Sequence, residues 1–215
     1  MRSLEQIAPS RALTGPWCNA DWRLSALLEA VSFVTPALEA FFIRTVVAAL
    51  RGNVVGPARH AALAFVREEA RHSIAHRRFN GALLDHLVQP PPALGWIEAA
   101  LGAATRRLSL PTRLRLVAVL EQASARVSAR YLNRAPAWRF GCPYAQRLFA
   151  LHAREELGHH AVIEALRPSA QPRRPMALLA DALAWVAVGA GATLYIATAV
   201  PWIALRKWRR RPLPA

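Results

Sequence analysis

Two short stretches of the sequence each place a glutamate three residues before a histidine. The first pair is Glu69 and His72, in REEARHSIAH, and the second is Glu156 and His159, in AREELGHHAV. Three residues is nearly one turn of an α-helix, so the two side chains of a pair leave the helix on one face and can bind the same metal ion. One such pair is typical of a solvated helix surface. Two pairs in one chain indicate a shared metal site.

Two further glutamates lie in strongly apolar helical sequence. Glu39 is in VTPALEAFFIRTVV and Glu121 is in LRLVAVLEQASARV. A carboxylate buried in such surroundings must be protonated, paired with an arginine or bound to metal. Arg44 and Arg126 are the candidate arginine partners. Metal binding is favoured by the order of the groups along the chain, because two-metal carboxylate sites in bundles use a glutamate from two helices and an ExxH pair from the other two.

The sequence therefore predicts a site for two metal ions on four carboxylates and two imidazoles. Two divalent cations would neutralise the four carboxylates, which removes most of the cost of burying them. The oxygen-rich donor set suits iron or manganese better than zinc. Two iron ions are the predicted cofactors, with manganese and zinc as alternatives. The predicted ligands are Glu39, Glu69, His72, Glu121, Glu156 and His159.

Other histidines lie close to the predicted ligands in the sequence. His76 follows His72 by four residues and shares its helical face, so it is a candidate seventh ligand or a group that orients a carboxylate. A surface position or a hydrogen-bonded place in the core is the alternative. His152 is a weaker candidate for an orienting role. His160 should point elsewhere, because adjacent helical residues are about 100° apart.

Three more polar side chains near the predicted ligands need an interpretation. Glu68 and Glu155 each precede a ligand glutamate, and we expect them to point away from the metal ions, toward arginines such as Arg71. Tyr131 is a candidate redox-active or hydrogen-bonding residue, with packing at the end of a bundle as the alternative.

Segments rich in proline and glycine divide the chain into long helical stretches. We predict helices at about 22–50, 56–87, 112–133 and 143–166. The connection between the second and third is long, and it contains a short helical segment from Trp96 to Arg107. Such a connection can carry the chain from one end of a bundle to the other. The predicted fold is all-α: a ferritin-like four-helix bundle with a long connection between its second and third helices and an additional hydrophobic C-terminal helix.

The composition fits one domain with an appended tail. The chain has 215 residues and 54% hydrophobic content, enough for one sizeable core. We expect an N-terminal extension at 1–21, the two-metal bundle at 22–168, and a hydrophobic helix with a basic tail at 176–215. Cys18 and Cys142 lack paired spacing, so we predict neither a disulfide framework nor a thiolate site. The N-terminus has no continuous apolar segment, so a cytoplasmic location is expected.

The net charge of +15 raises the question of an acidic partner. The arginines are scattered along the helices, without interleaved aromatic residues or zinc-finger spacing, so nucleic acid is not an expected partner. Anionic lipid headgroups or an acidic protein suit this charge at least as well.

The segment at 182–205 carries no charge and would extend about 36 Å as a helix, enough to cross a bilayer. Basic residues flank it at Arg173, Arg174, Arg206, Lys207, Arg209, Arg210 and Arg211. Because basic flanks tend to stay in the cytoplasm, a single span would export the more basic side. The alternatives are a hairpin broken near Gly189 and Gly191, an interfacial helix anchored by Trp202 and Trp208, or a fifth helix packed on the bundle or on a second subunit.

With these residues in place, the chain resembles the bacterial family described as predicted metal-dependent hydrolases, which is ferritin-like in its helical arrangement. The resemblance runs through PALEAFFIRTV, REEARHSIAHRRFN, the helix of Glu121 and HAREELGHHAV, over roughly 30–165. The family description implies hydrolysis, whereas the ligand pattern is similar to that of di-iron oxidases and oxygenases. The C-terminal part is shorter than the resemblance leads us to expect.

Three functions follow from these observations. The first hypothesis is a non-haem di-iron oxidase or oxygenase that activates O2 and oxidises an organic substrate, with a lipid as one candidate. The alternative is a di-metal hydrolase that uses a metal-activated water against an ester or amide. The third is a non-catalytic iron-binding bundle. The expected partners are a small-molecule or lipid substrate, an electron donor, the inner face of the cytoplasmic membrane and a second copy in a homodimer.

Overall fold

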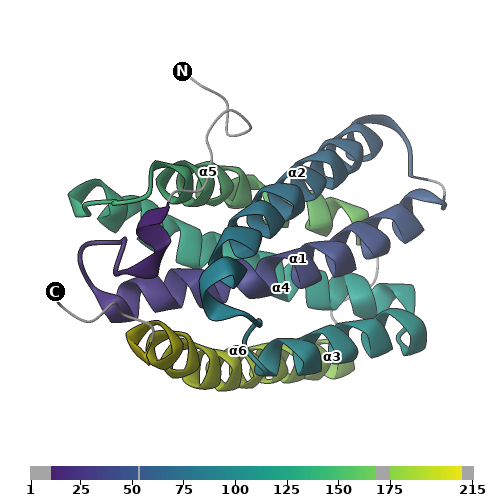
Figure 1. Ribbon diagram of the computed structural model, residues 1–215. Helices are drawn as coiled ribbons and strands as arrows, with labels where there is room; N and C mark the ends of the chain where they lie inside the picture. The colour runs from purple at the N-terminus through teal and green to yellow at the C-terminus, as the bar shows by residue number, and fades with distance from the viewer. Residues whose placement is uncertain (1–10, 53, 168–174, 210–215) are drawn as a thin grey trace, which may run out of the picture.

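The computed structural model describes residues 11–52, 54–167 and 175–209, and the long elements of this part of the chain are all α-helices. The bundle helices are α1 (Trp22–Leu50), α2 (Gly56–Leu87), α4 (Leu110–Arg134) and α5 (Pro143–Leu166). The connection from α2 to α4 contains α3 (Ala93–Arg107), and α6 (Pro175–Arg209) follows the bundle; η2 (Arg11–Thr14) and η3 (Ala135–Ala137) are short 3-10 helices. Figure 1 shows α3 and α6 on one side of α1 and α4, with α2 and α5 on the other. This confirms the predicted all-α class, the long connection and the additional C-terminal helix.

Local chemistry explains where the helices begin. The Asp21 carboxylate accepts the backbone N–H groups of Arg23 and Leu24, at 2.7 and 3.1 Å, and so caps α1. The Ser109 hydroxyl caps α4 in the same way. A proline lies in the first turn of α2, α4 and α5, where its missing N–H costs no helical hydrogen bond. Because Ser109 caps α4 and its proline lies in the first turn, α4 begins at Leu110, two residues before the predicted start at 112.

One proline lies inside α1 and leaves a carbonyl free. Pro36 has no N–H to donate to the carbonyl of Ser32, four residues earlier. That carbonyl instead accepts a hydrogen bond from the Asn80 side-chain amide on α2, at 2.9 Å. The interruption in α1 is thus compensated by a side chain of the neighbouring helix.

The bundle core consists of two hydrophobic clusters with a polar layer between them. Along α2, Phe65 belongs to one cluster and Phe79 to the other, with the ExxH pair between them. Along α5 the same order is Phe149, the ExxH pair and Ile163. The six predicted ligands therefore lie halfway along the bundle, where apolar side chains close both ends of the layer.

The last helix, α6, packs along the bundle on one face only. Tyr195 donates a hydrogen bond to the carbonyl of Ala30 at 2.8 Å, and Ile203 is fully buried. The opposite face exposes leucines and valines, for example Leu183 at 60% and Val186 at 67%. Packing as a fifth helix on the bundle is thus the alternative that the structure supports.

The hairpin alternative for the tail is wrong, because α6 is a continuous helix through Gly189 and Gly191. A glycine inside a helix costs only about 1 kcal/mol relative to alanine, so neighbouring helical residues can carry the chain through both positions. The flanking residues Arg173, Arg174, Arg210 and Arg211 lie outside the described residues, as do 1–10 of the expected N-terminal extension.

Candidate metal centre

All six predicted ligands meet in the polar layer. Each bundle helix contributes at least one of them, and none is more than 3% exposed. They are Glu39 from α1, Glu69 and His72 from α2, Glu121 from α4, and Glu156 and His159 from α5. The ExxH spacing presents both members of each pair to the same layer, as expected from helical geometry.

One half of the centre is built around the His159 imidazole. Its Nδ1 lies 2.8 Å from Oε1 of Glu69 and 3.3 Å from Oε1 of Glu156. Oε2 of Glu121 lies 3.8 Å from the same nitrogen. The donor atoms of Glu69, Glu156 and His159 are all within 4.8 Å of one another, so they can bind a single ion.

The other half is built around His72. Its Nδ1 lies 3.9 Å from Oε1 of Glu69, and the donor atoms of Glu39, Glu69 and His72 again lie within 4.8 Å of one another. Glu69 belongs to both groups of donors. The arrangement therefore offers two adjacent metal positions that share a carboxylate.

Two glutamates outside the layer hold the imidazoles in place. Glu155 on α5 contacts Nε2 of His72, and Glu68 on α2 contacts Nε2 of His159 at 3.2 Å. Arg71 lies 4.0 Å from Glu68 and 3.6 Å from Glu155. A proton on Nε2, held by a carboxylate, leaves the lone pair of Nδ1 free for a metal.

These outer glutamates contact Arg71, as the sequence analysis expected, but their contact with the opposite imidazole was missed. The sequence signal was present, because each ligand glutamate is preceded by a second glutamate, Glu68 or Glu155. The sequence did not show that α2 packs against α5. This packing brings Glu155 of α5 to His72 of α2, and Glu68 of α2 to His159 of α5.

The buried charges perturb one another strongly. Burial, together with the neighbouring carboxylates, raises the pKa of Glu39 and of Glu121 well above its usual range. Burial and the neighbouring His152 lower the pKa of His72 to about 4. Burial alone would lower the pKa of His159, but Glu156 and Glu69 outweigh it and raise that pKa to about 11.

The donor atoms of the layer fit a metal because most of them have no hydrogen-bond partner. These buried atoms are both oxygens of Glu39, Glu69 and Glu121, Oε2 of Glu156, and Nδ1 of His72 and of His159; Oε1 of Glu69 and Nδ1 of His159, 2.8 Å apart, form an ion pair without the alignment of a hydrogen bond. A buried polar atom without a partner costs about 1–3 kcal/mol, and native proteins contain few of them. Their concentration at one point, on carboxylates and imidazoles, is the arrangement that two divalent cations would satisfy.

The remaining candidates lie at different distances from the layer. His152 reaches into it, with Nε2 3.2 Å from Oε1 of Glu156 and Nδ1 3.8 Å from Oε1 of Glu39. His76 is buried behind His152, with its Nε2 3.0 Å from Nδ1 of that residue, and it forms a further group of possible donors with Glu39 and His152, all within 4.8 Å of one another. The sequence analysis ranked His76 above His152, whereas the geometry places His152 nearer the carboxylates.

Two side chains lie away from the centre. His160 faces Glu164 on its own helix, at 3.9 Å, in agreement with the expectation that it points elsewhere. Tyr131 packs its ring against Trp138 and Phe149, at centroid distances of 5.7 and 6.3 Å. The packing alternative is therefore the better description of this tyrosine.

Comparison with known proteins agrees with a metal centre. A family model described as "Predicted metal-dependent hydrolase" matches residues 4–211. No curated protein and no solved structure matches the chain. The family match runs beyond the 30–165 of the sequence resemblance and includes α6, so the helix at the C-terminus is part of what the family shares. With a match over nearly its whole length, the chain belongs to the family of predicted metal-dependent hydrolases.

Proposed function

We propose that this chain is a two-metal hydrolase that cleaves an ester or amide. The observation that carries the proposal is the convergence of four buried carboxylates and two imidazoles, most of their donor atoms without partners, on one layer of the bundle. The family description adds the reaction class. Two bound divalent cations would supply a water of lowered pKa and polarise the substrate carbonyl.

The side chains around this centre have separable tasks. The six predicted ligands would hold the ions, and Glu69, which lies in both donor groups, would bridge them. Glu68 and Glu155 keep the Nε2 protons of the opposite imidazoles in place. These two glutamates are 34% and 24% exposed, and Arg71 beside them is 66% exposed, so this edge of α2 and α5 is where a substrate would reach the layer.

The test is a cleavage assay with the full chain loaded with zinc, manganese or ferrous iron. Aryl esters and amides are the substrates, and each reaction is run with and without O2. We expect metal-dependent cleavage at the same rate in both atmospheres, lost in Glu121→Gln and retained in Glu164→Gln. Glu164 is a suitable control because it lies on the surface of α5, paired with Arg167. Cleavage that survives Glu121→Gln unchanged would contradict the proposal.

Oxidation remains a second candidate function, and the donor set favours it. Four carboxylates and few nitrogens suit iron better than zinc. The matching experiment loads the chain with ferrous iron under anaerobic conditions and then follows O2 consumption with an electrode. Consumption of O2 in proportion to bound iron, without cleavage of any ester or amide, would replace the hydrolase by the oxidase. Iron binding without O2 consumption and without cleavage would support the third hypothesis, a non-catalytic iron-binding bundle.

The exposed face of α6 supports a further proposal about location, that the helix lies in the plane of an anionic membrane surface. Within the part of the chain that the structure describes, two helices are long and apolar enough to cross a membrane, Trp22–Leu50 and Ala182–Arg209, but α1 is a core helix of the bundle. Because α6 packs along α1 through Tyr195 and Ile203, it could not cross a bilayer without taking α1 with it. An in-plane position buries the apolar outer face and leaves the bundle in water.

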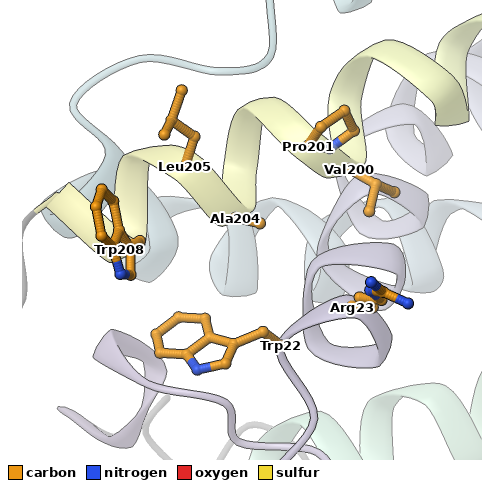
Figure 2. A pocket seen from close by; sticks show the side chains of 7 residues that line it. All are labelled: Trp22, Arg23, Val200, Pro201, Ala204, Leu205 and Trp208. Atoms are coloured by element: carbon orange, nitrogen blue, oxygen red, sulfur yellow. The ribbon is translucent and has the colours of Figure 1, made fainter.

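An open groove at the C-terminal end of α6 fits this position. Figure 2 shows the indole rings of Trp22 and Trp208 at one end of the groove and Arg23 near Val200 at the other. Tryptophans prefer the headgroup level of a bilayer, and arginines are attracted to anionic lipid. The groove is about 24 Å from Glu39 along α1, so it is not the way into the metal centre.

Vesicle binding tests this location. The chain should sediment with phosphatidylglycerol vesicles and much less with phosphatidylcholine vesicles, and its tryptophan fluorescence should shift to the blue on binding. The double variant L183E/V186E should lose binding, whereas Leu151→Glu, on the far side of the bundle in α5, should not. If L183E/V186E instead converts a dimer to a monomer and vesicles are never bound, α6 covers a second copy of the chain.

A further inference from the structure

We propose that His152 is a further metal ligand, bound through Nε2, and that His76 is the residue that positions it. The inference rests on the two-metal centre proposed above and deepens it. It follows from a chain of hydrogen bonds that begins at the proline inside α1 and ends in the polar layer.

The first step fixes the Asn80 side chain. Because Pro36 has no N–H, the carbonyl of Ser32 is available to another donor, and the Asn80 amide nitrogen donates to it at 2.9 Å. With its nitrogen on that carbonyl, Asn80 must present its amide oxygen on the other side. The Ser32 hydroxyl donates to that oxygen at 2.6 Å.

The second step fixes the proton of His76. A serine hydroxyl has one proton, and Ser32 has given it to Asn80. Nδ1 of His76 lies 2.8 Å from the same hydroxyl oxygen, so this nitrogen must carry a proton and donate it. Burial favours the neutral form of an imidazole, and His76 is only 1% exposed. Its Nε2 therefore carries a lone pair.

The third step determines which nitrogen of His152 carries a proton. Nε2 of His76 accepts from Nδ1 of His152 at 3.0 Å, so Nδ1 of His152 carries a proton. The other nitrogen of His152, Nε2, then has its lone pair directed at Oε1 of Glu156, 3.2 Å away. Two acceptors at that distance need a cation between them.

A metal ion is the cation that suits this position. The donor atoms of His72, His152 and Glu156 all lie within 4.8 Å of one another, and Nδ1 of His72 has no hydrogen-bond partner. The His72 and His152 rings also stack, at a centroid distance of 4.4 Å, and so lie side by side at this position. A proton would satisfy only Glu156 and His152, whereas a metal satisfies all three.

The consequence is that the two metal positions are unequal. One has two imidazoles, His72 and His152, and the other has one, His159. Nitrogen donors raise the affinity for the later divalent transition metals relative to an all-oxygen site. The two ions should therefore bind in two separate steps, the tighter one at the position of His152.

Cobalt(II) titration of the full chain tests the proposal, with bound metal counted and the visible spectrum of the cobalt recorded. The parent should bind two equivalents with different affinities. His152→Ala should weaken the tighter step about 100-fold and leave the other. His76→Leu should weaken the same step about 10- to 100-fold, the usual effect of losing a group that orients a ligand. His76→Gln should restore most of it, because an amide oxygen can accept the His152 proton.

Two controls separate this role from general damage. His160→Ala removes a histidine of α5 outside the layer, and Thr45→Ala removes a buried hydroxyl of α1 that bonds its own helix, as a match for Ser32→Ala. Both controls should leave the cobalt affinities unchanged, while Ser32→Ala weakens the tighter step. Nitrogen-15 NMR of the zinc-loaded chain should show a proton on Nδ1 of His152 and none on Nε2.

The failure of this inference is distinguishable from the failure of the proposed function. If the folded parent does not bind two ions, the two-metal centre is wrong. If the parent binds two ions but His152→Ala binds both with unchanged affinity, or if NMR finds the proton on Nε2 of His152, only the role given to His152 and His76 is overturned. If the His152→Ala chain does not fold, Ser32→Ala and the NMR measurement test the proposal instead.

Discussion

The first bundle helix buries two carboxylates in opposite circumstances. Glu29 and Glu39 are ten residues apart on α1 and are 0% and 2% exposed. Oε1 of Glu29 accepts hydrogen bonds from the Lys207 ammonium and from the Trp17 indole, the latter at 2.5 Å, whereas Oε2 has no partner and burial raises the pKa of the group. Neither oxygen of Glu39 makes a hydrogen bond of good geometry, and burial with the carboxylates of Glu69 and Glu156 raises its pKa more than Ser73 and Arg77 lower it.

The difference shows what separates a structural charge from a site. Burying a carboxylate is tolerable when a cation and a donor accompany it, and the Glu29 cluster, defined by Glu29, Lys207 and Trp17, supplies both within the chain. The polar layer contains too few cationic groups for its four carboxylates. Carboxylates that the protein itself does not neutralise are suited to bind cations from solution. The Glu29 cluster, in contrast, is structural and holds α6 and the N-terminal segment against α1.

The largest expected effect is on the Glu29 cluster. Lys207→Met should lower the free energy of unfolding by about 3–5 kcal/mol, because it leaves a buried carboxylate without its cation. Urea unfolding followed by circular dichroism measures the change. Replacing both partners, as Lys207→Met with Glu29→Leu, should recover most of the loss. If the double variant is no more stable than the single one, the pair is not the source of the stability.

Metal should stabilise the polar layer by a similar amount. Zinc or manganese at about 1,000 times its dissociation constant should raise the free energy of unfolding by about 4 kcal/mol, which is about 8–16 °C in Tm for a chain of this size. The shift should persist in Lys207→Met, whose defect is elsewhere, and disappear in Glu121→Gln. An equal shift in Glu121→Gln would show that the added metal stabilises the chain at another place.

The indole of the Glu29 cluster offers a smaller change. Trp17→Phe keeps an aromatic ring among Phe79 and Phe149 but removes the N–H that donates to Glu29. A hydrogen bond to a charged group is worth about 1.5–3 kcal/mol, so stability should fall by about that amount. Metal affinity should not change. A loss of metal binding in this variant would mean that the two regions are coupled.

The last effect is close to zero near pH 4.5, grows with pH, and distinguishes the two kinds of carboxylate. Burial and the nearby Glu156 and Glu69 raise the pKa of Glu121, so the folded metal-free chain holds a proton there that the unfolded chain releases above about pH 4.5. The unfolded state then binds fewer protons, and this group makes stability fall as pH rises. Glu121→Gln should match the parent near pH 4.5 and exceed it by up to about 1.4 kcal/mol for each pH unit above.

The control for this pH series is Glu29→Gln, measured by the same unfolding experiment without metal. It removes the partner of Lys207, so it should be less stable than the parent at pH 7 rather than more stable. Two glutamine variants that change stability in the same direction at pH 7 would contradict the distinction between the Glu29 cluster and the polar layer.

Much of the fold could be predicted, because helix periodicity and breakers are local signals. The predicted helices at 22–50 and 56–87 agree with α1 and α2. The ExxH pairs could also be found, because the spacing of three residues fixes which side chains share a face. Glu29 was missed, although it lies in apolar sequence like that around Glu39, because the lysine that pairs with it follows 178 residues later.

The sequence by itself determined which residues could do chemistry and on which helical faces they lie, since both depend on residue type and on contacts within one helix. Only the tertiary structure decided how those faces are matched. Helix packing brought Glu155 to His72 and Glu68 to His159, put a lysine in direct contact with Glu29 and placed Glu39 beside the carboxylates of Glu69 and Glu156. These outcomes depend on which helices are neighbours and at what height, and no local pattern of residues encodes that.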